Sequence, residues 1–172
     1  NADTLLQVDD LKVHFPRPKS GWFQPPEVVK AVDGVSFSVR RGTTLAVVGE
    51  SGSGKTTTAL AVMRLSPVTA GRIRLGDTEL GTMAGEDLRL ARRRLQIIFQ
   101  DPYSSLNPRE RAGSAVRAPL DLMGIGTPAE REARVAELFM QVGLRPEQQH
   151  LFPHQFSGGQ RQRINIARAL AT

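Results

Sequence analysis

The residues best suited to chemistry form one run, Gly49-Glu50-Ser51-Gly52-Ser53-Gly54-Lys55-Thr56, which fits the pattern G-x-x-x-x-G-K-[ST]. Its glycines let the backbone curl so that N–H groups point inward at an anion. The Lys55 ammonium suits the β- and γ-phosphates of a nucleotide, and the Thr56 hydroxyl is a hard oxygen ligand for Mg²⁺. We therefore expect residues 49–57 to bind a nucleoside triphosphate, with Lys55 as a catalytic residue and Thr56 as a metal ligand.

Two elements must hold this loop. The apolar run Thr44–Val48 precedes it and predicts a buried strand, whereas Thr57–Leu65 follows it and predicts a helix. The start of that helix adds free N–H groups and the positive end of its dipole. A strand, a glycine-rich turn and a helix form the context that the motif requires, which argues against a chance lysine in an ordinary glycine-rich loop.

A second strand is predicted at Leu95–Phe99, and it ends on Gln100. A side-chain amide at the carboxyl end of a parallel strand faces the crevice where α/β folds bind ligands. Gln100 is therefore a candidate catalytic residue and Mg²⁺ ligand that reaches either the metal or the attacking water. The alternative is a solvated glutamine in a loop.

The segment Ser157-Gly158-Gly159-Gln160 also has the properties of an anion site. Ser157 is a good N-cap, and the glycines leave the N–H groups of the first helical turn unobstructed. The helix that follows has Ile164, Ala167 and Ala171 at helical spacing for burial. On another face it has Arg161, Asn165 and Arg168. An ordinary capped helix is the alternative, but two adjacent glycines destabilise a helix start unless something approaches the backbone closely.

The run Gly49–Thr56 together with Phe156–Gln160 resembles the ABC-type ATPases, whose signature reads Leu-Ser-Gly-Gly-Gln, with Phe156 in place of the leucine. Three segments are similar to the ATP-binding subunits of dipeptide and oligopeptide importers, which include nickel and glutathione relatives: Val48–Lys55, Ile97–Arg109 and Pro153–Ile164. The resemblance extends from about Leu6 to Leu170. It implies an α/β fold of the P-loop NTPase type, with an incomplete core sheet, an antiparallel β subdomain and a helical subdomain.

The resemblance also implies a division of the chain. Residues 1–172 would be the N-terminal part of one nucleotide-binding domain. The β subdomain and phosphate-loop core would take about 1–100, the helical subdomain about 101–156 and the signature helix 157–172. ABC ATPases continue beyond that helix into a strand with a catalytic Glu and then a switch histidine, which have no counterpart in the 172 residues here. We therefore expect this portion alone to be inactive and to leave Thr44–Val48 and Leu95–Phe99 without parallel neighbours.

The function implied by the resemblance is an ATP-binding and ATP-hydrolysing subunit that powers solute import, above all of peptides, with ATP and Mg²⁺ as cofactors. A second ATPase subunit, identical or different, and membrane permease subunits would be direct partners, and a solute-binding protein an indirect one. The location would be cytoplasmic and peripheral on the inner face of the membrane. The implied nucleotide-binding residues are Gly49, Glu50, Ser51, Gly52, Ser53, Gly54, Lys55, Thr56, Thr57, Phe15, Ser157, Gly158, Gly159 and Gln160.

Phe15 has two possible roles. The family often places an aromatic ring against adenine at this position, whereas the alternation of apolar and polar residues over Leu5–Phe15 allows a core residue of the first strand. Other predicted elements are a loop at Pro16–Pro26 with an exposed Trp22–Phe23 pair, hairpin strands Val28–Val32 and Val35–Val39 around Asp33-Gly34, a strand from Arg72, and helices Ala112–Met123 and Pro128–Val142.

The net charge of +6 raises the question of nucleic-acid binding. Arginines gather at Arg89–Arg94, Arg109–Arg117 and Arg161–Arg168, but no aromatic residues alternate with them, and aromatic residues make up only 5% of the chain. The first cluster reads as a solvated helical face. We expect no nucleic-acid partner, although a soluble ABC-type ATPase acting on nucleic acid or ribosomes is the alternative function. No apolar run is long enough to span a bilayer directly.

Overall fold

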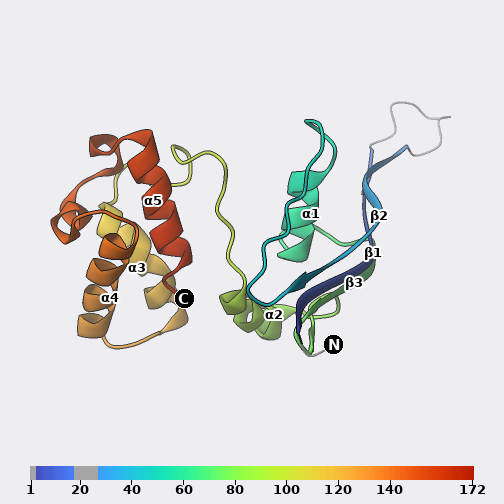
Figure 1. Ribbon diagram of the computed structural model, residues 1–172, viewed down its shortest axis with the longest axis horizontal. Helices are drawn as coiled ribbons and strands as arrows, with labels where there is room; N and C mark the ends of the chain where they lie inside the picture. The colour runs from blue at the N-terminus through green and yellow to red at the C-terminus, as the bar shows by residue number, and fades with distance from the viewer. Residues whose placement is uncertain (1–2, 18–26) are drawn as a thin grey trace. The chain divides into compact units, whose positions relative to one another are not determined.

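The computed structural model describes residues 3–17 and 27–172. The chain divides into two compact units, one up to Arg92 and one from Arg93 onward, and each is described by itself (Figure 1). No helix in these ranges combines the length and apolar character needed to cross a membrane. The expected Trp22–Phe23 pair lies outside the described residues.

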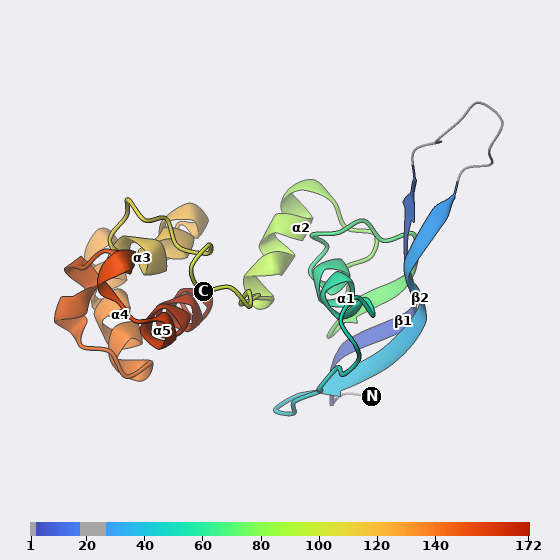
Figure 2. The same ribbon diagram turned by 90° about the horizontal axis from the view of Figure 1, so that it is seen from above.

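The first unit is built on a four-stranded antiparallel sheet with the order β2–β1–β3–β4. Its strands are β1 (Thr4–Pro16), β2 (Val28–Arg40), β3 (Ala70–Leu75) and β4 (Thr78–Glu79). Val8, Leu11 and Val13 are fully buried, so the predicted half-buried first strand is confirmed. Helix α1 (Lys55–Val62) contacts both β1 and β2, which themselves run side by side (Figure 2).

The predicted hairpin at Asp33-Gly34 is wrong, because β2 runs through these residues as one strand. The register passes from Leu11 opposite Val35 to Lys12 opposite Asp33, so Gly34 is an extra residue in β2. Its φ of +83° is a left-handed conformation that favours glycine. An Asp-Gly pair therefore marks a β-bulge here, since β1 supplies a partner on both sides of it.

Both predicted core strands are also wrong, because neither Thr44–Val48 nor Leu95–Phe99 forms a strand. Val48 is 90% exposed and Phe99 is 47% exposed. No strand in the described part of the chain pairs with either segment. An apolar pattern cannot make a strand by itself, since the backbone N–H and C=O groups need a neighbouring strand. The expectation that these segments lack parallel neighbours is confirmed.

The second unit is a small helical bundle. Its main helices are α3 (Ala112–Met123), α4 (Pro128–Gln141) and α5 (Gly158–Ala169), with 3-10 turns η2 (Pro146–His150) and η3 (Pro153–Gln155) between the last two. The predicted helices are confirmed. Helix α3 packs against both α4 and α5 (Figure 1). Leu138, Phe139, Val116 and Ile164 are fully buried among them, and this apolar cluster stabilises the unit.

The arginine cluster after α2 (Gly85–Ala91) does not form a uniformly solvated face. In the short turn η1 (Arg92–Arg94), the partly buried Arg92 donates from Nε to the carbonyl of Met63 at 3.2 Å, and from Nη2 to the carbonyl of Arg64. These carbonyls follow the last turn of α1, where no further helical N–H is available. Arg92 therefore caps the helix that follows the phosphate-binding run, and the sequence interpretation of this residue is wrong.

We predict that Arg92→Met destabilises the protein by about 1–3 kcal/mol, because two carbonyls lose a charged donor. The urea midpoint of the intact protein, followed by circular dichroism, measures the effect. Arg93→Met is the matched control, since Arg93 is exposed in the same turn and should change the midpoint little. An equal shift in both variants would contradict the capping role.

Candidate phosphate-binding site

The backbone of the predicted phosphate loop is curled and leads directly into α1 (Figure 1). Gly52 and Gly54 have φ values of +82° and +89°. A Cβ built on Gly54 would lie only 2.3 Å from the carbonyl oxygen of Ala31 in β2. Glycine at position 54 is therefore required twice, by its left-handed conformation and by the close approach of β2.

Lys55 closes over its own loop. Its Nζ donates to the carbonyl oxygens of Gly49 at 2.7 Å and Glu50 at 2.6 Å, and it lies 3.4 Å from Ser53 Oγ. These acceptors fix the ammonium at the loop instead of leaving it in solvent. A phosphate oxygen is a stronger partner for an ammonium than a carbonyl is, because both groups are then charged.

The start of α1 is suited to an anion. Its first helical backbone bond runs from Thr58 N to the Gly54 carbonyl at 2.8 Å, and within the described chain no side chain caps the preceding turn. The first turn carries no acidic residue. The loop and the helix start thus supply backbone N–H groups, the Lys55 ammonium and the Thr56 hydroxyl, a set that fits phosphate groups and one hydroxyl ligand for Mg²⁺.

Phe15 lies in β1, where it pairs with Val29 of β2. Its side chain is 37% exposed, so its alternative role as a core residue is wrong. The exposed ring leaves an apolar face available, and its contact with adenine stays a prediction.

The segment Ser157–Gln160 forms a capping box at the start of α5. The Gln160 N–H donates to Ser157 Oγ at 3.3 Å, and the Ser157 N–H donates to Gln160 Oε1 at 3.0 Å. The N-cap prediction for Ser157 is confirmed. Both polar side chains are thereby oriented at the first turn of α5.

The two adjacent glycines of this segment have different surroundings. A Cβ on Gly158 would lie 3.0 Å from Tyr103 Oη, whereas nothing in the described chain lies within 4 Å of a Cβ on Gly159. The close approach that the glycine pair suggested is thus made at Gly158 by a tyrosine. Sequence reasoning did not find Tyr103, since only the folded unit brings it to α5.

Gln100 is exposed and does not terminate a strand. Asp101 after it accepts a hydrogen bond from the Tyr103 N–H at 2.8 Å. Two hydrogen bonds to the Asp101 carboxylate lower its pKa. The one from the Ser104 side chain has the larger effect, and the one from the Tyr103 N–H the smaller. The structure brings residues 49–57 together in the first unit and places Gln100 with Ser157–Gln160 in the second. The metal-binding role of Gln100 stays a prediction.

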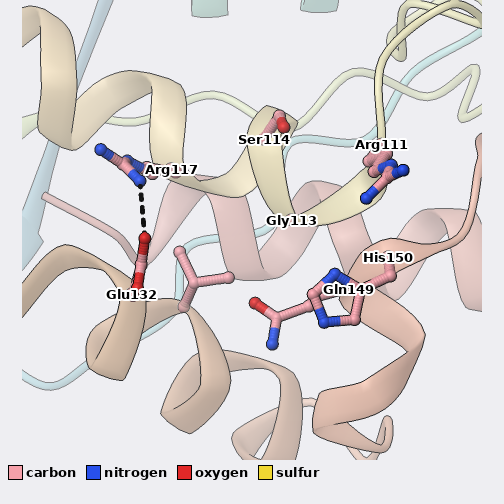
Figure 3. Close-up of a pocket in the computed structure, with 8 residues that line it drawn as sticks. Arg111, Gly113, Ser114, Arg117, Glu132, Gln149 and His150 are labelled. Atoms are coloured by element: carbon pink, nitrogen blue, oxygen red, sulfur yellow. Dashed lines mark hydrogen bonds and ion pairs between the residues drawn. The ribbon is translucent and has the colours of Figure 1, made fainter. Parts of the chain in front are cut away.

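The second unit also contains a pocket of about 320 Å³ at α3, α4 and η2 (Figure 3). Arg117 of α3 pairs there with Glu132 of α4, with 3.4 Å between Nη1 and Oε1. The residues that line it are Arg111, Gly113, Ser114, Arg117, Glu132, Val135, Gln149 and His150. None of them is a predicted site residue, and the ion pair joins two helices of the bundle.

Comparisons with known proteins identify the family of this chain. Residues 32–172 match the family model described as ABC transporter. The oligopeptide transport ATP-binding protein AppF of Bacillus subtilis is 46% identical over 172 residues, covering 99% of this chain and 52% of its own length. The glutathione import ATP-binding protein GsiA of Salmonella typhimurium is 46% identical over 171 residues, covering 99% of this chain and 27% of its own length.

A solved structure of an ATP-binding cassette is similar to this chain in fold. The ATP-binding cassette MJ0796, described as dimeric, in a post-hydrolysis state and bound to ADP and Pi, superposes with a TM-score of 0.80 at 28% identity. The match covers 96% of this chain and 69% of that one, so the predicted ABC-type fold is confirmed. The chain spans about half the length of the peptide-transport relatives it matches, 48% and 52% for two of them. This chain belongs to the ABC transporter family.

Proposed function

We propose that this chain is the N-terminal part of the ATP-binding subunit of an importer, with peptides as the transported solute. The observation that carries the proposal is the Lys55 ammonium, held by a glycine-rich loop at the uncapped start of α1. Relatives named for oligopeptide transport and glutathione import support the choice of solute. Neither name points to nucleic acid, the alternative function.

Each residue of the loop has a role in this proposal. Residues 49–57 hold the phosphates of ATP through backbone N–H groups, and Lys55 neutralises the charge on the β- and γ-phosphates. The Thr56 hydroxyl and the Gln100 amide oxygen are the proposed ligands of Mg²⁺, which neutralises further phosphate charge when bound. Phe15 offers its ring to adenine.

Ser157–Gln160 has a different task, which is to contact the ATP held by a second ATPase subunit, identical or not. The capping box orders this segment, and the open space at Gly159 leaves room for a phosphate to approach the backbone. The dimeric description of MJ0796 is consistent with such an arrangement. Permease subunits would dock on this dimer at the cytoplasmic face of the membrane, and a solute-binding protein would act through them. Within this chain, about 1–100 would form the β subdomain and phosphate-loop core, about 101–156 the helical subdomain, and 157–172 the signature helix.

A competition titration tests the proposal. The intact protein with Mg²⁺ should bind a fluorescent ATP analogue saturably, and both ATP and ADP should displace it. AMP should compete weakly, because the loop is built for the β- and γ-phosphates. Absence of binding, or equal competition by AMP, would contradict the proposal. Uptake of a labelled peptide into vesicles that carry the permease, dependent on ATP, tests the solute.

A further inference from the structure

We infer that Tyr103 and Ser105 are positioning residues that hold α5 to the segment following Gln100, Tyr103 at the start of the helix and Ser105 along its second half. The importance of that start rests on the proposed function, in which Ser157–Gln160 contacts ATP. Neither Tyr103 nor Ser105 is among the proposed nucleotide-binding residues. Their contacts lie entirely within the second unit, and they fall on three positions of α5: Arg161, Asn165 and Arg168.

Tyr103 makes the first contact. Its ring lies beneath the guanidinium of Arg161, with 4.3 Å from Cζ to the ring centroid, within the range of a cation–π interaction. The Tyr103 side chain also lies against Gly158, where a Cβ would be 3.0 Å from Tyr103 Oη and 3.6 Å from Tyr103 Cζ. Tyr103 is nevertheless 61% exposed, so burial of its own surface does not explain its position.

Ser105 makes the second contact. Its Oγ accepts a hydrogen bond from Asn165 Nδ2 at 2.8 Å, and its carbonyl accepts one from Arg168 Nη1 at 2.8 Å. Asn165 is only 3% exposed, and its Oδ1 has no partner among the described residues. A buried amide with one group already unpaired depends strongly on the remaining bond, because losing it would leave a second polar group unsatisfied.

The hydrogen bonds continue toward Gln100. The Ser105 hydroxyl that accepts from Asn165 also donates to the Asp101 carbonyl at 2.8 Å, and the Asp101 carboxylate accepts from the Tyr103 N–H. A hydroxyl that both donates and accepts is locked in orientation, and such a chain of bonds is strengthened by mutual polarisation. Asp101 is the residue directly after Gln100.

The contacts on α5 share one face. Arg161, Asn165 and Arg168 follow one another at helical spacing, so one short segment can hold three successive points of the helix. A displacement of the Gln100 segment would therefore carry the first turn of α5 with it, since both are fixed in one packed unit. Tyr103 is closest to that turn and is the residue to change.

Hydrogen exchange of the intact subunit, without nucleotide, tests the contact directly. In Tyr103→Ala, the amides of Gln160, Arg161 and Gln162 should exchange about fivefold faster, because the first turn of α5 opens locally. Tyr103→Phe keeps the ring over Arg161 and should stay within about twofold of the original chain. Leu122→Ala, which removes a 79% exposed side chain from α3, is the matched control and should change nothing at α5. Unchanged exchange in Tyr103→Ala would overturn the inference.

ATPase kinetics separate positioning from simple structural support. Tyr103→Ala should lower kcat about tenfold with the Kd for ATP unchanged, whereas Tyr103→Phe should retain most of it. Faster exchange with an unchanged kcat would overturn the positioning role. A loss of ATP affinity as large as the loss of kcat would also overturn it. If the original subunit neither binds nor hydrolyses ATP, the proposed function fails, while the exchange result still decides whether Tyr103 holds α5.

Discussion

Lys55→Ala is expected to abolish tight ATP binding by the intact protein. The lysine is the single cation between Gly49 and Thr57, and its Nζ lies within 2.7 Å of two loop carbonyls. Losing a charge-assisted contact to phosphate costs about 2–3 kcal/mol or more, which weakens Kd by roughly 30- to 150-fold. Titration with a fluorescent ATP analogue measures this loss.

The matched control for Lys55→Ala is Lys30→Ala. Lys30 is an exposed lysine of β2 in the same unit, and its Nζ bonds to Asp33 at 3.2 Å instead of to the loop. Its removal should leave the Kd for ATP within about twofold, because an exposed ion pair contributes little and lies apart from the phosphates. Unchanged affinity in Lys55→Ala would exclude the loop from the nucleotide site.

The sequence predicts well those elements whose information is local. Ala112–Met123 was expected as a helix and is one, and the capping pair Ser157 and Gln160 defines the start of α5. Thr127 with Glu130 similarly begins α4. In α4 and α5 the capping hydrogen bonds at the helix start join residues only three apart, so the pattern contains its own partners.

Elements that depend on distant partners were not predictable in the same way. Thr44–Val48 has the composition of a buried strand, but without a neighbouring strand in the described chain it remains irregular and exposed. Asp33-Gly34 has the composition of a hairpin turn, yet the pairing of β2 with β1 makes it a bulge. Arg92 looked like a surface charge because its acceptors, beyond the end of α1, are distant in sequence.

The candidate site shows the same distinction between local and distant information. The motif residues 49–57 identify their own loop, whose shape follows from glycine conformations and from one lysine. The neighbours of Gly158 and Gly159 do not follow from the motif, and only the structure shows that Tyr103 fills one side and leaves the other open. That difference determines which glycine gives the cleaner test of the proposed contact between Ser157–Gln160 and the ATP of a second subunit.

Gly159→Asp should block ATP-dependent dimerisation and hydrolysis while leaving ATP binding to the monomer intact. A Cβ at this position has no neighbour within 4 Å in the described chain, so the side chain fits. An acidic residue in the first turn of α5 also favours the helix through its dipole, so stability should not fall. In the proposed dimer, however, the carboxylate would face the γ-phosphate of the second subunit's ATP, and like charges at short range repel strongly. We expect turnover to fall about 100-fold, or roughly 2.7 kcal/mol in activation free energy.

Gly159→Asn separates charge from size in this test, because its side chain has the same shape as aspartate without the negative charge. It should lose much less activity than Gly159→Asp if repulsion of phosphate is the cause. Position 158 is less suitable, since a side chain there would also displace Tyr103. Turnover is measured with the permease present, and dimerisation by size-exclusion chromatography with and without ATP. Full turnover in Gly159→Asp would show that Ser157–Gln160 does not contact the nucleotide of a second subunit, whereas equal losses in both variants would assign the effect to the side chain's bulk.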